Sequence, residues 1–111
     1  MKPTLRDNYR YLVVRLISQS QLSKEDLDKI VQKELVPIIG QIHYSKVMPK
    51  VAFFDRFGQS GIIRCLNGGS GLLRSGLSMM TSYNSEKVHV MPIFTSGTIR
   101  KAKEVMNKKT D

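Results

Sequence analysis

Two short stretches contain residue types that act on phosphates in other proteins. The first, "NGGSGLLRSG" at 67–76, is rich in glycine and precedes a segment with helical spacing of apolar residues, as nucleotide-binding loops do. A P-loop needs a lysine that this stretch lacks, and Arg74 stands where G-x-G-x-x-G requires its last glycine. A flexible connection between a strand and a helix is therefore favoured, although amides at the helix start can also meet an RNA phosphate.

The second stretch, "SGTIRKAK" at 96–103, joins a small-residue turn to a cluster of bases. Backbone amides at a helix N-terminus bind anions, and positive side chains nearby strengthen that binding. A phosphate grip and a plain helix cap followed by a solvated charged face explain the pattern equally well. The candidate residues are Ser96, Gly97, Thr98, Arg100, Lys101 and Lys103.

Groups for protein-based catalysis do not gather in the sequence. Asp55 adjoins Arg56 near a predicted hairpin, which favours a turn or an ion pair over general-base work. His89 and Cys65 alternate with apolar residues in predicted strands, as packed or partly exposed sheet residues do. One cysteine excludes an internal disulfide, and the two histidines are far apart, so we expect no catalytic residue, metal site or cofactor in the protein itself.

Charge is the strongest feature of the composition. The 111 residues include 18 Lys and Arg against 9 Asp and Glu, a net charge of +9. Residues 23–35 have one excess negative charge, which leaves +10 on the rest. This asymmetry predicts a polyanionic partner and a separate, slightly acidic surface that avoids nucleic acid.

The apolar pattern predicts four strands and three helices. The predicted strands cover 9–18, 50–57, 60–66 and 87–96, and the predicted helices cover 23–39, 72–83 and 98–109. The first helix begins with Ser23 as N-cap and Asp26 as its capping-box partner, and it should end or kink at Pro37. Residues 41–49 are ambiguous, Gly76 is expected to lie close to the sheet, and Pro92 indicates an edge or a bulge.

This order predicts an α+β fold with a four-stranded antiparallel sheet. Right-handed crossovers would place the two internal helices on one face of a βαββαβ sandwich of the ferredoxin-like or RRM-like plan, with an added C-terminal helix. Residues 1–111 are expected to form this single domain. No window resembles a membrane span or a signal peptide, so a cytoplasmic protein without a membrane partner is expected.

The predicted sheet favours contacts with phosphates over the reading of bases. "SGIIRCL" in the third strand lacks the aromatic residues of the RNP1 pattern, so sequence-specific binding of single strands is disfavoured. Arg10, Arg15 and Arg64 lie in predicted strands and suit phosphate contacts. Each of these arginines is explained equally well as a member of an ion pair at the rim.

Three segments together resemble one family across nearly the whole chain. "RYLVVRLIS", "GIIRC" and "SGTIRKA" are similar to ribonuclease P protein component 2 of archaea, whose relatives also serve eukaryotic ribonuclease P. The matching positions are Arg10, Tyr11, Arg64, Cys65, Ser96, Gly97, Thr98, Ile99 and Arg100. The glycine-rich loop at 67–71 differs from the more charged loop expected of relatives, so the resemblance implies no contact for it.

The resemblance implies an accessory subunit of a ribonucleoprotein endonuclease that removes the 5′ leader of precursor tRNA. The catalytic centre and its magnesium would belong to the RNA subunit. The implied partners are the ribonuclease P RNA with its precursor tRNA, a TIM-barrel-like protein subunit, and a second copy of the chain in a heterotetramer.

Two alternatives remain beside this RNA-binding hypothesis. The chain could serve as a scaffold that bridges other protein subunits and touches RNA little. It could also be a self-sufficient RNA-cleaving or acylphosphatase-like enzyme, which would need a catalytic set that the sequence does not reveal.

Overall fold

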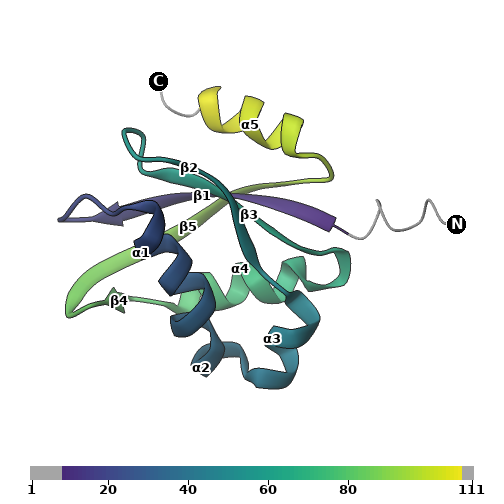
Figure 1. Cartoon of the computed structure of the whole chain (residues 1–111), viewed down its shortest axis with the longest axis horizontal. Coiled ribbons are helices and arrows are strands. Elements are labelled where there is room, and N and C mark those ends of the chain that lie inside the picture. Colours follow the sequence, from purple (N-terminus) through teal and green to yellow (C-terminus); the bar gives the residue numbers. More distant parts are fainter. Residues whose placement is uncertain (1–8, 109–111) are drawn as a thin grey trace, which may run out of the picture.

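The computed structural model describes residues 9–108, so residues 1–8 and 109–111 of the predicted domain and last helix lie outside the described part. Five strands form one antiparallel sheet in the order β2-β3-β1-β5-β4. They are β1 (Tyr9–Ser18), β2 (Lys50–Asp55), β3 (Ser60–Leu66), β4 (Ser82–Tyr83) and β5 (Glu86–Ser96). Figure 1 shows helices on both sides of this sheet.

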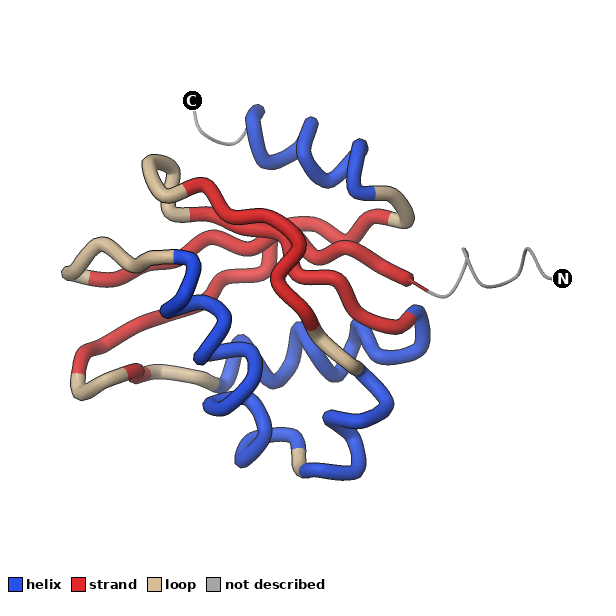
Figure 2. Tube along the Cα trace, in the orientation of Figure 1, coloured by secondary structure: helices blue, strands red, loops and turns tan. Residues whose placement is uncertain are grey.

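The helices divide unequally between the two faces of the sheet. On one face lie α1 (Lys24–Lys29), the π-helix η2 (Ile30–Glu34), α2 (Leu35–Ile39), α3 (Gln41–Val47) and α4 (Ser70–Met79), which follows the short 3₁₀ helix η3 (Asn67–Gly69). The last helix, α5 (Ile99–Lys108), crosses the other face (Figures 1 and 2). The prediction that the internal helices share one face is confirmed.

The central strand β1 is apolar on both faces, as its sequence predicts. Leu12, Val14 and Leu16 alternate into the large core under α1–α4, while Val13 packs beneath α5. Both Val13 and Val14 are fully buried. Two packed layers on opposite faces explain why the usual alternation of apolar and polar residues is lost at the strand's centre.

The four-stranded sheet was an incomplete prediction, because a fifth strand forms within the range predicted for the second helix. That helix ends at Met79, and Ser82–Tyr83 turns back to pair with Glu86–Lys87. Asn84 and Ser85 make the turn with φ of 58° and 70°. Asparagine tolerates this left-handed region, which a two-residue hairpin needs.

The backbone departs from regular geometry near Pro37 in the first helical segment and near Pro92 in β5. The predicted end of the first helix at Pro37 is wrong: α2 continues through Pro37 to Ile39 and is capped by Gly40, where φ is 87°. The π-helical turn at 30–34 directly precedes this segment, which widens the helix before the proline ring and its missing N–H group. In β5, the register with β1 shifts between Val13 and Val14, opposite Pro92 and Phe94, so the predicted bulge is confirmed.

Gly76 makes its close approach to a helix, and the predicted approach to the sheet is wrong. A Cβ atom at position 76 would lie 2.7 Å from Leu35 Cδ1 and from Ile39 Cγ2 of α2. The small residue therefore lets α4 pack against α2. The ambiguous residues 41–49 contain α3, whose last residue, Val47, is buried against Gly69.

Candidate nucleic-acid interface

The candidate residues gather chiefly at one end of the sheet, because β1 runs antiparallel to both of its neighbours. Arg10 is opposite Cys65, Tyr11 is opposite both Arg64 and Ser96, and the turn at 96–98 follows directly. The start of β1 thus meets the ends of β3 and β5. Arg15 lies five residues further along, about 17 Å away at 3.3 Å per residue, and is exposed.

Arg10 lies against the turn that opens α5. Its side chain is half-buried, and Nη1 donates a hydrogen bond to the Tyr9 carbonyl at 3.1 Å. A Cβ atom added to Gly97 would lie 3.7 Å from the same Nη1. The guanidinium therefore adds positive charge beside the turn at 96–98.

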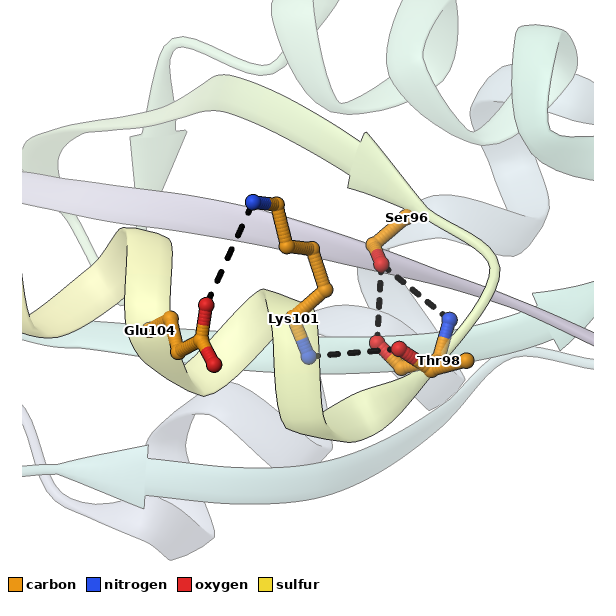
Figure 3. Close-up of polar contacts among 4 residues, drawn as sticks. All are labelled: Ser96, Thr98, Lys101 and Glu104. Atoms are coloured by element: carbon orange, nitrogen blue, oxygen red, sulfur yellow. Dashed lines mark hydrogen bonds and ion pairs between the residues drawn. The ribbon is translucent and has the colours of Figure 1, made fainter.

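The hydroxyl groups of this turn are used within the turn itself (Figure 3). Ser96 Oγ accepts the Thr98 amide at 3.1 Å and donates to the Thr98 carbonyl at 2.8 Å. Thr98 Oγ1 accepts the Lys101 amide at 3.2 Å, as an N-cap residue does. Both hydroxyl groups therefore have the roles expected of a plain helix cap. Any anion bound here would be held by backbone amides and by positively charged side chains.

The bases of α5 project away from its buried stripe. Ala102 and Met106 are buried against the sheet, while Arg100, Lys101 and Lys103 are exposed. Lys101 forms an ion pair with Glu104 at 4.0 Å (Figure 3), and both side chains are more than half exposed, so the pair adds little stability. Lys103 Nζ lies 4.8 Å from the centre of the Phe53 ring.

Arg64, like Arg10, is half-buried. Its guanidinium carbon lies 4.4 Å from the centre of the Tyr9 ring, a cation–π contact. The cross-strand partner of Arg64 in β2 is Lys50. Sequence reasoning missed both Tyr9 and Lys50, because their neighbours depend on strand register.

Groups considered for protein catalysis remain dispersed or inert. Burial raises the pKa of the Cys65 thiol to about 11, against a smaller lowering effect of Arg10, so the thiol is protonated at neutral pH. Asp55 accepts the Phe57 amide at 3.1 Å, which is the predicted turn role. Within residues 9–108, no three His, Cys, Asp or Glu side chains lie close enough to hold a metal ion.

The glycine-rich connection at 67–71 is an ordered turn in this structure. Residues 67–69 form η3, and Gly69 is buried, with a Cβ atom there only 2.8 Å from Val47 Cα. Arg74, one turn into α4, donates to Thr95 Oγ1 at 2.9 Å. The structure therefore gives this loop a packing role.

Comparison with known proteins identifies the family. The sequence matches the Rpp14/Pop5 family over residues 10–107. The chain belongs to this family. Ribonuclease P protein component 2 of Thermococcus kodakarensis is 31% identical over 103 residues, 93% of this chain and 86% of that protein. Its counterpart in Pyrococcus horikoshii is 28% identical over the same shares.

The fold also occurs in a eukaryotic complex. A chain of the yeast ribonuclease MRP structure aligns with 93% of this chain and 92% of its own length, with a TM-score of 0.65. At 13% identity this likeness concerns the fold alone. Within the described part of the chain, no helix is both long and apolar enough to span a membrane.

Proposed function

We propose that this chain is a protein component of ribonuclease P, which removes the 5′ leader of precursor tRNA. The observation that carries the proposal is the family match over residues 10–107, with archaeal relatives named ribonuclease P protein component 2. Catalysis and magnesium binding are assigned to the RNA subunit. The protein binds the folded RNA subunit and stabilises it. The complex is assigned to the cytoplasm.

The RNA-binding surface proposed here is the end of the sheet where β1 begins. Arg10 and the turn at 96–98 provide a cation and helix N-terminal amides side by side, and Arg100 adds a second cation. Arg64 provides a stacked guanidinium on the neighbouring strand. Such groups contact phosphates and fix orientation without reading sequence.

The opposite side of the sheet suits protein partners. The helical segment from Lys24 to Ile39 has the slightly acidic composition and lies across the sheet from α5. We assign to this side the contact with a TIM-barrel-like subunit, and place a second copy of the chain in the same assembly. The strand order β2-β3-β1-β5, with α1–α4 on one face, supports the RRM-like plan.

Reconstituted cleavage of a precursor tRNA tests this function. Adding the chain to the RNA subunit and the other protein subunits should accelerate leader removal, and the double variant Arg64→Ala/Arg100→Ala should weaken RNA binding while subunit pairing persists. Intact RNA affinity with disrupted pairing would favour the scaffold alternative. Cleavage by the purified protein without RNA would establish a protein enzyme instead.

A further inference from the structure

A pocket of about 380 Å³ opens where the chain leaves α3 and enters β2. Its wall is mostly apolar and includes the half-buried ring of Tyr44, the exposed Met48 and the buried Pro49. Lys50 and Arg64 are the charged residues of the wall. The volume lies in the lower part of the usual range for small-ligand sites, about 300–1,000 Å³.

The two cationic residues of this pocket occupy paired positions on neighbouring strands. Lys50 of β2 is the direct cross-strand partner of Arg64 of β3. Like charges in this position destabilise a sheet, and neither forms an ion pair with any residue from 9 to 108. A bound anion between them would relieve the repulsion.

Arg64 is held in place yet has an unused hydrogen-bond donor. Its guanidinium stacks on Tyr9, which limits its rotation. Its Nε is buried and has no hydrogen-bond partner within the described part of the chain. A buried N–H group normally has a partner, so the hydrogen-bonding capacity of Arg64 is not fully used by the described residues around it.

We propose that this pocket binds one unpaired nucleotide of RNA, with its phosphate on Lys50 and Arg64 and its base against Tyr44 and Pro49. The inference rests on the proposed function and names the RNA feature that this chain recognises. The proposed nucleotide site lies beside β2 and is separate from the proposed phosphate-binding turn at 96–98.

The chemistry of the wall favours a nucleotide over an acidic peptide. A base has two flat apolar faces that stack on an aromatic ring, and its phosphate fits the fork of an arginine. The amide of Gln32, also in the wall, can both donate to and accept from the edge of a base. A glutamate side chain would neutralise the cations but leave the ring and the apolar wall uncovered.

Fluorescence anisotropy with the full chain and a labelled, unpaired RNA octanucleotide tests the stacking contact. Tyr44→Leu should weaken binding about fivefold to a hundredfold, as loss of one base–aromatic stack does. Tyr44→Phe retains the ring and should bind as the natural chain does. A blunt RNA duplex offers no unstacked base, so Tyr44→Leu should leave duplex binding unchanged.

The phosphate contact has its own measurement. Lys50→Ser should lower the slope of log affinity against log salt by about 0.7 for the octanucleotide. Lys87→Ser is the matched control, because Lys87 is an exposed lysine at the other end of the sheet and its loss changes the net charge equally. Equal effects of the two substitutions would overturn the proposal.

Two further results would also overturn it. One is unchanged octanucleotide affinity in Tyr44→Leu; the other is a penta-glutamate peptide that displaces the octanucleotide and binds equally well to both Tyr44 variants. If the natural chain supports precursor tRNA cleavage while Tyr44→Leu binds the octanucleotide normally, only the pocket assignment fails. If the chain does not support cleavage, the proposed function fails, and the octanucleotide assay still decides the pocket.

Discussion

At the scale of single residues, Asp26 links the start of α1 to β4. Its Oδ2 accepts the Ser23 amide at 2.9 Å, and its Oδ1 accepts the Tyr83 hydroxyl at 3.1 Å. Ser23 Oγ in turn accepts the Asp26 amide at 3.2 Å, which completes the predicted capping box. The hydrogen bond from the Ser23 amide is the main cause that lowers the pKa of Asp26 below its ordinary value of 3.8, against an opposing effect of burial.

The lowered pKa of Asp26 predicts a contribution to stability that depends on pH. A carboxyl group with a lower pKa in the folded state stabilises the fold fully above its unfolded value, and the contribution is lost as pH falls below 3.8 and through the folded pKa. Asp26→Asn should therefore cost about 1–2 kcal/mol at pH 7 and make unfolding less dependent on pH in this acidic range. Urea unfolding at a series of pH values measures both effects.

Tyr83→Phe is the control for Asp26, because it removes one of the hydrogen bonds to the carboxylate and leaves the capping box intact. Its cost should be smaller than that of Asp26→Asn, and the acid dependence should largely persist. If Asp26→Asn leaves the pH dependence of stability unchanged, the capping box does not hold the carboxylate as this geometry requires.

At the scale of elements, the contact between α2 and α4 depends on the absence of a side chain at Gly76. Gly76→Ala would place a methyl group 2.7 Å from Leu35 and Ile39, and forced overpacking of this kind costs about 1–3 kcal/mol. Gly71→Ala is the matched control in the same helix, because nothing lies within 4 Å of its Cβ position. That substitution should be neutral or stabilising by up to about 1 kcal/mol. Chemical unfolding of both variants measures their free energies of unfolding. Equal values for the two variants would contradict the close contact between α2 and α4 at Gly76.

Strand register explains why Lys50 was missed as a candidate site residue. Counting back from the hairpin, an uninterrupted ladder would place Val51 opposite Arg64 and Lys50 opposite the buried Cys65. The structure instead shifts the register between Val51 and Phe53, so that Val51 enters the core and Lys50 faces Arg64. Apolar alternation predicts the strand, but this single extra residue decides which side chain joins the site.

The regular elements were predictable to different degrees for physical reasons. The bounds of β1 and β3 agree with the predicted residues, because dense β-branched runs bordered by polar residues leave little choice. Residues 41–47 lack a clear period, since Ile42 is 72% exposed and only Val47 is buried, so α3 depends on its neighbours. The site's arginines could be found by residue type, whereas Tyr44 could not, because residues 41–47 have no clear period that shows which of their side chains face β2.

At the scale of the whole molecule, α5 changes what the sheet can offer to RNA. It covers the face opposite α1–α4 and buries Val13 and Ile62 beneath Ala102 and Met106. The centre of that face is therefore closed to bases, and the cations lie around its rim. This arrangement favours binding to the shape and charge of a folded RNA.

The separation of charge between the two sides of the sheet predicts how RNA affinity depends on salt. Arg10→Ala/Arg100→Ala removes two cations beside the turn at 96–98, whereas Lys24→Ala/Lys29→Ala removes two lysines from the acidic helix. Both variants lower the net charge equally, so a general attraction to RNA would weaken equally in both.

If phosphates bind directly at the proposed surface, the two variants should differ in how their RNA affinity depends on salt. Binding isotherms at several salt concentrations measure this dependence. For a single-stranded RNA, the first variant should lower the slope of log affinity against log salt by about 1.4, because each phosphate that is no longer neutralised accounts for about 0.7. The second variant should retain the natural slope, because its lysines lie on the side assigned to protein partners. A lower slope in the second variant alone would place the RNA on the α1 side of the sheet. Equal slopes in the natural chain and both variants would favour the scaffold alternative, since neither surface would then neutralise phosphates.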